Sequence, residues 1–384
     1  MSIKLNHDTV NRADIDALIE WLTNTPELPQ LTKGPLTQQF ERQWADMIGS
    51  KHGLFVNSGS SAILLVLAAL KYIPNRLKNN KIVVPALSWA TDVSSPLLLG
   101  YDTYMCDCNL NDLSCDLNHL EHIFKEHDPG VLLLVSPLGF IPEMDQVMAL
   151  CDKHNVEIVE DVCESMWSSY HDKKLGTFGS AGLFSLYFGH HVSSIEGGLI
   201  VTDDDQLHEY MTMIRSHGWD RDLPEHRQLQ LREQHGLKQF EAMFKFYVPG
   251  MNLRATDVQA FLGLRAIDKI DGYSKIRNNN LAHYCEMIIN NQLNITNSET
   301  HFNSNFAYPY MHPERDRIAE QLFENQIDCR PLIAGNMARN PMWLKDAEDL
   351  PNADKINDFG MYLPNHQCIT KQNIEQIADI VNKF

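Results

Sequence analysis

The chain has 384 residues, a hydrophobic content of 43% and a formal net charge of −18 at pH 7. A chain of this length and composition can bury a large core in one large domain with a smaller partner. The net negative charge argues against nucleic acid or an anionic membrane surface as a general partner. The first residues do not resemble a signal peptide, and the longest apolar run, residues 131–135, is too short to span a bilayer. We therefore expect a cytoplasmic protein that does not insert into membranes.

Apolar runs of strand length alternate with longer helical patterns over the first 200 residues. In chain order we expect a strand at 53–56, a helix at 60–70, a strand at 82–84, a helix ending near 99, a strand at 131–135, a helix at 143–154 and a strand at 156–159. This alternation predicts an α/β fold with a mostly parallel sheet.

Helical patterns dominate after residue 198, most clearly at 203–216 and 256–270. We place the end of a large domain, residues 1–265, close to the second of these. Residues 266–384 are predicted to form a smaller C-terminal α/β domain that ends in a helix over 371–384.

The segment 220–245 is rich in charge and poor in apolar runs, so it is expected to be an exposed excursion, either a lid or a solvated insertion without a role. The eight cysteines contain no C-x-x-C pair. Cys106, Cys108 and Cys115 lie close together in the sequence, but we expect reduced thiols and no metal site.

Three segments combine residue types that suit a phosphorylated cofactor. The turn Asn57 to Ala62 follows a strand and opens a helix, and small residues there let backbone N–H groups approach a phosphate. Residues 156–161 form an apolar strand that ends in Asp161, where parallel sheets place their ligands. Residues 184–198 read as a strand, a loop containing His190 and His191, and a Glu-Gly-Gly turn.

Together these segments resemble the DegT, DnrJ, EryC and StrS family of pyridoxal phosphate (PLP) enzymes, which act on nucleotide sugars and have fold type I. The resemblance runs from Gly34 to Pro364. In the aminotransferases of this family, the seventh residue counted from Phe184 is the lysine that binds the cofactor covalently. Here it is His190, which cannot form that bond but can move protons near neutral pH.

The resemblance also implies roles for other residues. Asp161 is expected under the pyridine nitrogen and Glu164 near the ring hydroxyl, with a raised pKa if the two share a proton. Trp89 is expected to stack on the ring. The phosphate is assigned to three small residues, Gly59, Ser60 and Ser185.

Three further residues are assigned by resemblance to a partner subunit or to the substrate. Asn252 is expected to reach the phosphate in a neighbouring subunit, which implies a homodimer with shared active sites. Arg254 is a candidate for binding substrate, with a structural ion pair as the alternative, and Arg330 is a candidate contact for the nucleotide.

His190 and His191 are expected to point to opposite sides of an extended segment, so that only His190 faces the cofactor.

Within the family, the His-His and Glu-Gly-Gly pattern looks most like enzymes that remove the C3 hydroxyl of a nucleotide-linked 4-keto-6-deoxyhexose, GDP-4-keto-6-deoxy-D-mannose above all. L-Glutamate would first convert PLP to pyridoxamine 5′-phosphate, and His190 would then serve as the acid and base of the elimination. Two alternatives to this prediction stay open. The first is an aminotransferase that makes an amino sugar with another residue as its base. The second is a catalytically silent PLP-binding regulatory protein.

Overall fold

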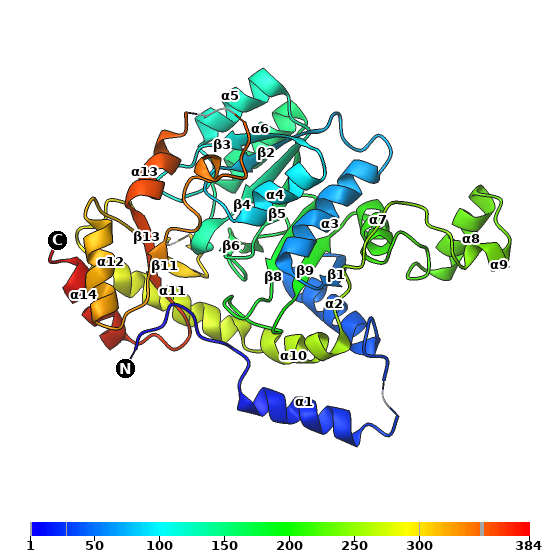
Figure 1. The fold of residues 1–384 in the computed structure, drawn as a ribbon, viewed down its shortest axis with the longest axis horizontal. Helices are drawn as coiled ribbons and strands as arrows, with labels where there is room; N and C mark the ends of the chain where they lie inside the picture. Colours follow the sequence, from blue (N-terminus) through cyan, green and yellow to red (C-terminus); the bar gives the residue numbers. More distant parts are fainter. Residues whose placement is uncertain (1, 28, 299, 346–348) are drawn as a thin grey trace.

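The computed structural model describes residues 2–27, 29–298, 300–345 and 349–384. Its central element is a seven-stranded sheet with the strand order β1-β9-β8-β5-β4-β2-β3 (Figure 1). Six of these strands run in the same direction, and β9 alone is antiparallel to its neighbours. The strands are β1 (His52–Val56), β2 (Lys81–Pro85), β3 (Asp102–Cys106), β4 (Val131–Val135), β5 (Glu157–Asp161), β8 (Ala181–Ser185) and β9 (Gly198–Thr202). The predicted α/β fold with a mostly parallel sheet is confirmed.

Helices cover both faces of this sheet because successive side chains of its buried strands point to opposite faces. Leu54 and Val56 join one hydrophobic core, while Phe55 between them joins the other. The first core includes side chains of α3 (Gly59–Tyr72), α4 (Ala90–Leu98) and α7 (Asp205–Arg215). The second includes side chains of α2 (Pro35–Ile48), α5 (Leu117–His127), α6 (Met144–His154) and α10 (Asp257–Ile267).

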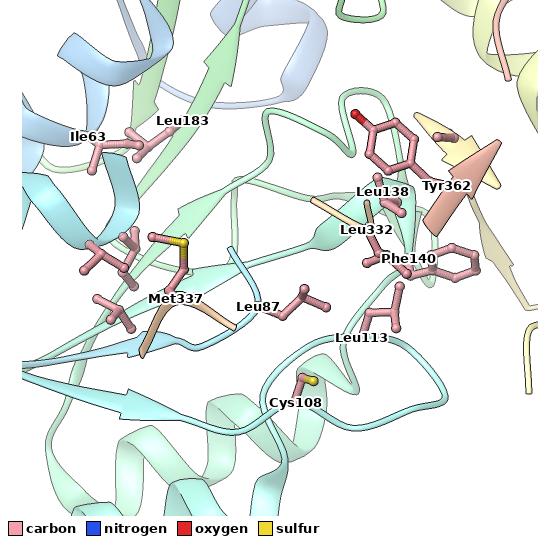
Figure 2. Close-up of a cluster of buried hydrophobic side chains, with 14 of the residues drawn as sticks. Ile63, Leu87, Cys108, Leu113, Leu138, Phe140, Leu183, Leu332, Met337 and Tyr362 are labelled. Atoms are coloured by element: carbon pink, nitrogen blue, oxygen red, sulfur yellow. The ribbon is translucent and has the colours of Figure 1, made fainter. Parts of the chain in front are cut away.

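The last third of the chain forms a small antiparallel sheet with the order β11-β13-β12 and its own helices. Its elements are α11 (Ile270–Met287), β11 (Ala307–Met311), α12 (Arg315–Glu324), β12 (Arg330–Pro331), a 3₁₀ turn (Met337–Arg339), α13 (Pro351–Phe359), β13 (Gly360–Pro364) and α14 (Lys371–Val381). The proposed boundary at 265 falls two residues before α10 ends, and the division into two domains stays a prediction. The core continues across it, since Leu332 and Tyr362 pack with Leu138 and Phe140 (Figure 2).

Three short strands, β6 (Ser169–Tyr170), β7 (Lys173–Lys174) and β10 (His301–Phe302), form a third sheet, and a 3₁₀ turn (Pro137–Gly139) follows β4. The N-terminal segment crosses to the C-terminal region, where Ile3 pairs with Ile327, and α1 (Arg12–Asn24) then packs on α10. No helix of the described residues is both long and apolar enough to cross a bilayer.

The segment 220–245 forms α8 (Glu225–Gln234) and α9 (Gln239–Ala242), which project away from the sheet (Figure 1). It is an exposed excursion, as predicted. None of its residues lines the cavity of the large sheet described below.

Candidate active site

A cavity of about 310 Å³ lies at the carboxyl edge of the large sheet. Its walls come from the segments that follow β1, β2, β5 and β8, and from Val135 at the end of β4. Parallel sheets bind ligands at this edge because the strand ends and the helix N-termini that follow them meet there. The C-terminal region closes one side with Phe306, Arg330 and Tyr362.

Most of the site residues expected from the sequence line this cavity. The eight that do so are Gly59, Ser60, Trp89, Asp161, Glu164, Ser185, His190 and Arg330. Asn252 and Arg254 do not line it. Asn252 is exposed, and its Oδ1 accepts a hydrogen bond from the backbone N–H of Arg254 at 3.3 Å.

The first turn of α3 forms one end of the cavity. Ser58 caps this helix by accepting a hydrogen bond from the N–H of Ser61 at 3.1 Å. The N–H groups of Gly59 and Ser60 lie in the first turn, where a helix offers no backbone acceptor, so they are available to an anion. A Cβ atom on Gly59 would lie 2.8 Å from the Cβ of Ser185, so only glycine lets these two segments approach so closely.

Two acidic side chains, Asp161 and Glu164, lie close together in the cavity wall. Asp161 ends β5 and is 5% exposed, and its Oδ1 accepts the N–H of Cys163 at 2.8 Å. Glu164 accepts the N–H of Leu138 at 2.9 Å. Burial, with a contribution from Asp161, raises the pKa of Glu164 to about 7. The sequence analysis expected the pKa of Glu164 to be raised by the ring hydroxyl of the cofactor. In the structure, burial and Asp161 already raise this pKa without the cofactor.

His190 lines the cavity from the loop after β8. Its side chain is partly exposed, and its Nδ1 has no hydrogen-bond partner among the residues that the structure describes. Burial, with a smaller contribution from the Arg277 guanidinium, lowers the pKa of His190 to about 4. The imidazole is therefore neutral at physiological pH and able to accept a proton.

The prediction that His190 and His191 lie in an extended segment is wrong. The N–H of His190 donates to the carbonyl of Tyr187 at 2.9 Å, which closes a turn. His191 is fully buried, and its Nε2 lies 2.8 Å from the carbonyl oxygen of Ser304. Both rings neighbour Phe306, with centroid distances of 5.3 and 6.3 Å. The turn directs His190 alone into the cavity.

No lysine lines the cavity among the residues that the structure describes. Lys173 is exposed. Lys174 donates to the carbonyl of Trp167 and lies 4.0 Å from the centre of that indole ring. Neither lysine is placed to replace the one that family aminotransferases use.

The rim of the cavity carries Trp89 and Arg330. Trp89 is the N-cap residue of α4 and is 59% exposed, so its indole ring is largely free. Arg330 is exposed on β12, where it is the strand partner of Tyr362 on β13.

The sequence analysis missed several lining residues, notably Asn6, Asp92, Cys163 and Tyr362. Asn6 lies on the N-terminal segment, close enough that a Cβ on Gly189 would lie 2.7 Å from its Nδ2. No sequence pattern marks it. Asp92 follows Trp89 by three residues, so its place in the first turn of the predicted helix was a usable signal.

Comparisons with known proteins agree with this geometry. The model of the DegT/DnrJ/EryC1/StrS aminotransferase family matches residues 13–382. The chain is 31% identical over 364 residues to GDP-4-keto-6-deoxy-D-mannose 3-dehydratase of Yersinia pseudotuberculosis, which covers 92% of each protein. It is 24% identical to GDP-perosamine synthase of Caulobacter vibrioides, covering 90% of this chain and 88% of that protein.

Solved structures of 3-dehydratases have the same fold as this chain. The structure of the Escherichia coli GDP-4-keto-6-deoxy-D-mannose-3-dehydratase with bound hydrated PLP superposes with a TM-score of 0.86 at 28% identity, covering 99% of this chain and all of that one. A structure of GDP-4-keto-6-deoxymannose-3-dehydratase with a trapped PLP–glutamate geminal diamine gives 0.87 at 28% identity, covering 98% of this chain and 99% of that one. This chain therefore belongs to the DegT/DnrJ/EryC1/StrS aminotransferase family.

Proposed function

We propose that this PLP-dependent nucleotide-sugar enzyme removes the C3 hydroxyl of a nucleotide-linked 4-keto-6-deoxyhexose, with GDP-4-keto-6-deoxy-D-mannose as the first candidate. The observation that carries the proposal is that His190 lines the cavity. The resemblance implies a lysine at this position in the family's aminotransferases. A neutral imidazole transfers protons without forming a covalent bond to the cofactor, which favours elimination over amine transfer.

The residues of the cavity fit PLP at each of its polar positions. The first turn of α3, with Gly59 and Ser60, and Ser185 at the end of β8 would hold the phosphate, because all three line the cavity and a helix N-terminus attracts anions. Asp161 would hold the ring nitrogen, and Glu164 the ring hydroxyl. Trp89 offers a free aromatic face for stacking, which matters more when no covalent bond holds the cofactor.

When bound, PLP supplies an electron-accepting ring that stabilises negative charge developing on the substrate. The protein's part is to position this ring and to move protons. The carboxylate of Asp161 favours a protonated ring nitrogen. The imidazole of His190 would accept the proton released in the elimination and give a proton to the departing C3 hydroxyl, which leaves as water. General acid–base catalysis of this kind contributes roughly 10²–10⁴-fold.

The amino donor proposed for the first half of the cycle is L-glutamate. Support comes from the solved 3-dehydratase structure named for a PLP–glutamate adduct. Another structure of that enzyme, a histidine-to-asparagine variant, is named for bound GDP-perosamine, which supports a GDP-linked sugar as the other substrate. Arg330, exposed at the rim, is proposed to contact the nucleotide.

We also propose that two copies of this chain share their active sites. Asn252 and Arg254 lie outside the cavity of their own chain, although both belong to the segment that resembles the family's Asn-x-Arg motif. In a twofold dimer the same surface faces its copy, so these residues would reach the partner's cavity. Asn252 would contact the phosphate there and Arg254 the substrate.

The test is the mass of the product formed from GDP-4-keto-6-deoxy-D-mannose with protein, PLP and L-glutamate. A product whose hexose has lost one oxygen supports 3-dehydration. A product in which an amine replaces the ketone oxygen supports the aminotransferase alternative and contradicts the role given to His190. Unchanged substrate calls for the same assay with CDP- and UDP-linked sugars, and the absence of any product there would favour the regulatory alternative.

A further inference from the structure

Asp92 is a second carboxyl group beside Asp161, and it is completely buried. It lies in the first turn of α4, where its Oδ2 accepts the N–H of Trp89 at 3.0 Å. Its Oδ1 is buried and accepts no hydrogen bond from the residues that the structure describes. The carboxyl group lies within hydrogen-bonding reach of that of Asp161. A buried carboxyl oxygen without a donor is costly unless the group itself carries the proton and donates it.

The charges around this pair also favour one retained proton. Glu164 and the thiol of Cys163 face the two carboxyl groups and bring no positive charge. Among the described lining residues the one arginine is Arg330, at the exposed rim. Two carboxylates at hydrogen-bonding distance repel each other strongly in a buried place, so one of them keeps its proton.

Asp92 is the member of the pair that keeps it. Asp92 is 0% exposed and its Oδ1 lacks a hydrogen-bond partner among the described residues, whereas Asp161 is 5% exposed and neither of its oxygens is left buried without a partner, so charge on Asp92 is penalised more. Burial, together with Asp161 and Glu164, holds the pKa of Asp92 well above its usual range. The positive ring nitrogen expected beside Asp161 would favour the negative charge on that residue.

We propose that Asp92 is a positioning residue that stays a neutral carboxylic acid and donates a hydrogen bond to Asp161. The pair then presents a single negative charge, held in one orientation, to the ring nitrogen of PLP. This inference rests on the role proposed for Asp161 and extends it, because the residue that touches the cofactor is fixed by one that does not.

Infrared spectra of the full-length protein, with and without PLP, test the protonation state directly. At neutral pH the difference between wild type and Asp92→Asn should contain the carbonyl band of a protonated carboxyl group. A difference that contains carboxylate bands instead would show that Asp92 is ionised and would overturn the proposal. This measurement needs no substrate, so it is independent of whether the proposed dehydration occurs.

Cofactor affinity tests the hydrogen bond. Asparagine keeps both contacts, since its amide can accept from Trp89 and donate to Asp161, and Asp92→Asn should bind PLP within about threefold of wild type. Leucine has a similar size and no donor, so Asp92→Leu should bind PLP at least about tenfold more weakly. Wild-type affinity in a folded Asp92→Leu protein would contradict the proposal. If the leucine variant does not fold, the infrared comparison still decides.

Discussion

His190 and Glu164 line the same cavity, and burial moves their pKa values in opposite directions. It lowers the pKa of His190 to about 4 and raises the pKa of Glu164 to about 7. For both residues the cause is the same, because a poorly solvated site disfavours whichever form is charged. Near neutral pH the cavity thus holds a neutral base and a carboxyl group that is about half protonated, which suits a reaction that moves protons in both directions.

The role of His190 predicts the behaviour of His190→Asn. An amide cannot accept the proton, so turnover should fall by roughly 10²–10⁴-fold, while PLP affinity stays within about threefold of wild type. Steady-state assays of product and spectroscopic titration with PLP measure the two quantities.

His191→Gln is the matched control for that variant. The longer amide of glutamine can still donate to the carbonyl of Ser304, the contact that Nε2 of His191 makes now, and the ring of His191 lies outside the cavity wall. This variant should keep its turnover. If both substitutions reduce turnover equally, the loop as a whole matters and His190 has no separate chemical role.

Glu164 predicts a dependence of stability on pH. Because its pKa in the folded protein is raised, the folded state holds a proton that the unfolded chain releases near pH 4.5. The contribution of this protonated carboxyl group to the free energy of unfolding is fully present below about pH 4.5 and is lost as the pH rises to about 7. The loss amounts to at most about 3 kcal/mol, and to less in practice because the side chain is partly exposed.

Glu164→Gln cannot release a proton, so this loss should disappear. Urea unfolding of the PLP-free protein at pH 5 and pH 8 measures it. We expect the difference in unfolding free energy between the variant and wild type to shift in favour of the variant at pH 8. The idea fails if that difference is the same at both pH values.

The sequence predicted those parts of the site that depend on one strand and the turn after it. Asp161 ends β5, Gly59 opens α3 after β1, and Ser185 ends β8, so a parallel sheet brings them to one edge wherever the other elements lie. The turn that directs His190 into the cavity depends on one backbone hydrogen bond to Tyr187, which no pattern of residue types marks.

Contacts between segments that lie far apart in the sequence could not be predicted, for a different reason. Asp257 begins α10, and its carboxylate accepts the N–H groups of Gly34, Leu36 and Thr37 at 2.8, 3.2 and 3.3 Å at the start of α2. Asn6 reaches the cavity from the first residues of the chain. Both contacts depend on how segments distant in the sequence pack in three dimensions, and hydrophobic periodicity within one segment carries no information about that.

Gly59 is predicted to tolerate no side chain. In Gly59→Ala the new Cβ would meet Ser185 at 2.8 Å from its Cβ and 3.1 Å from its Oγ, and overpacking of this kind costs about 1–3 kcal/mol. The displaced Ser185 hydroxyl should also weaken PLP binding. Thermal unfolding and PLP titration measure the two effects.

A glycine elsewhere serves as the control. Gly272 lies inside α11, and a Cβ there would have nothing within 4 Å. Gly272→Ala should stabilise the protein by about 0.5–1 kcal/mol, since alanine loses less conformational freedom in a helix, and should leave PLP affinity unchanged. Equal PLP affinities in the two alanine variants would contradict the proposal that Gly59 contributes to the phosphate site.

Shared active sites predict that two inactive variants restore each other. In a dimer of His190→Asn with Asn252→Ala, one of the two sites combines an intact His190 from one subunit with an intact Asn252 from the other. Random mixing of equal amounts gives half mixed dimers, so about one quarter of wild-type activity should return when the variants are co-expressed. The variants purified separately should both be far less active. Activity that does not rise on co-expression, although mixed dimers form, would mean that Asn252 serves only its own chain and that the sites are not shared.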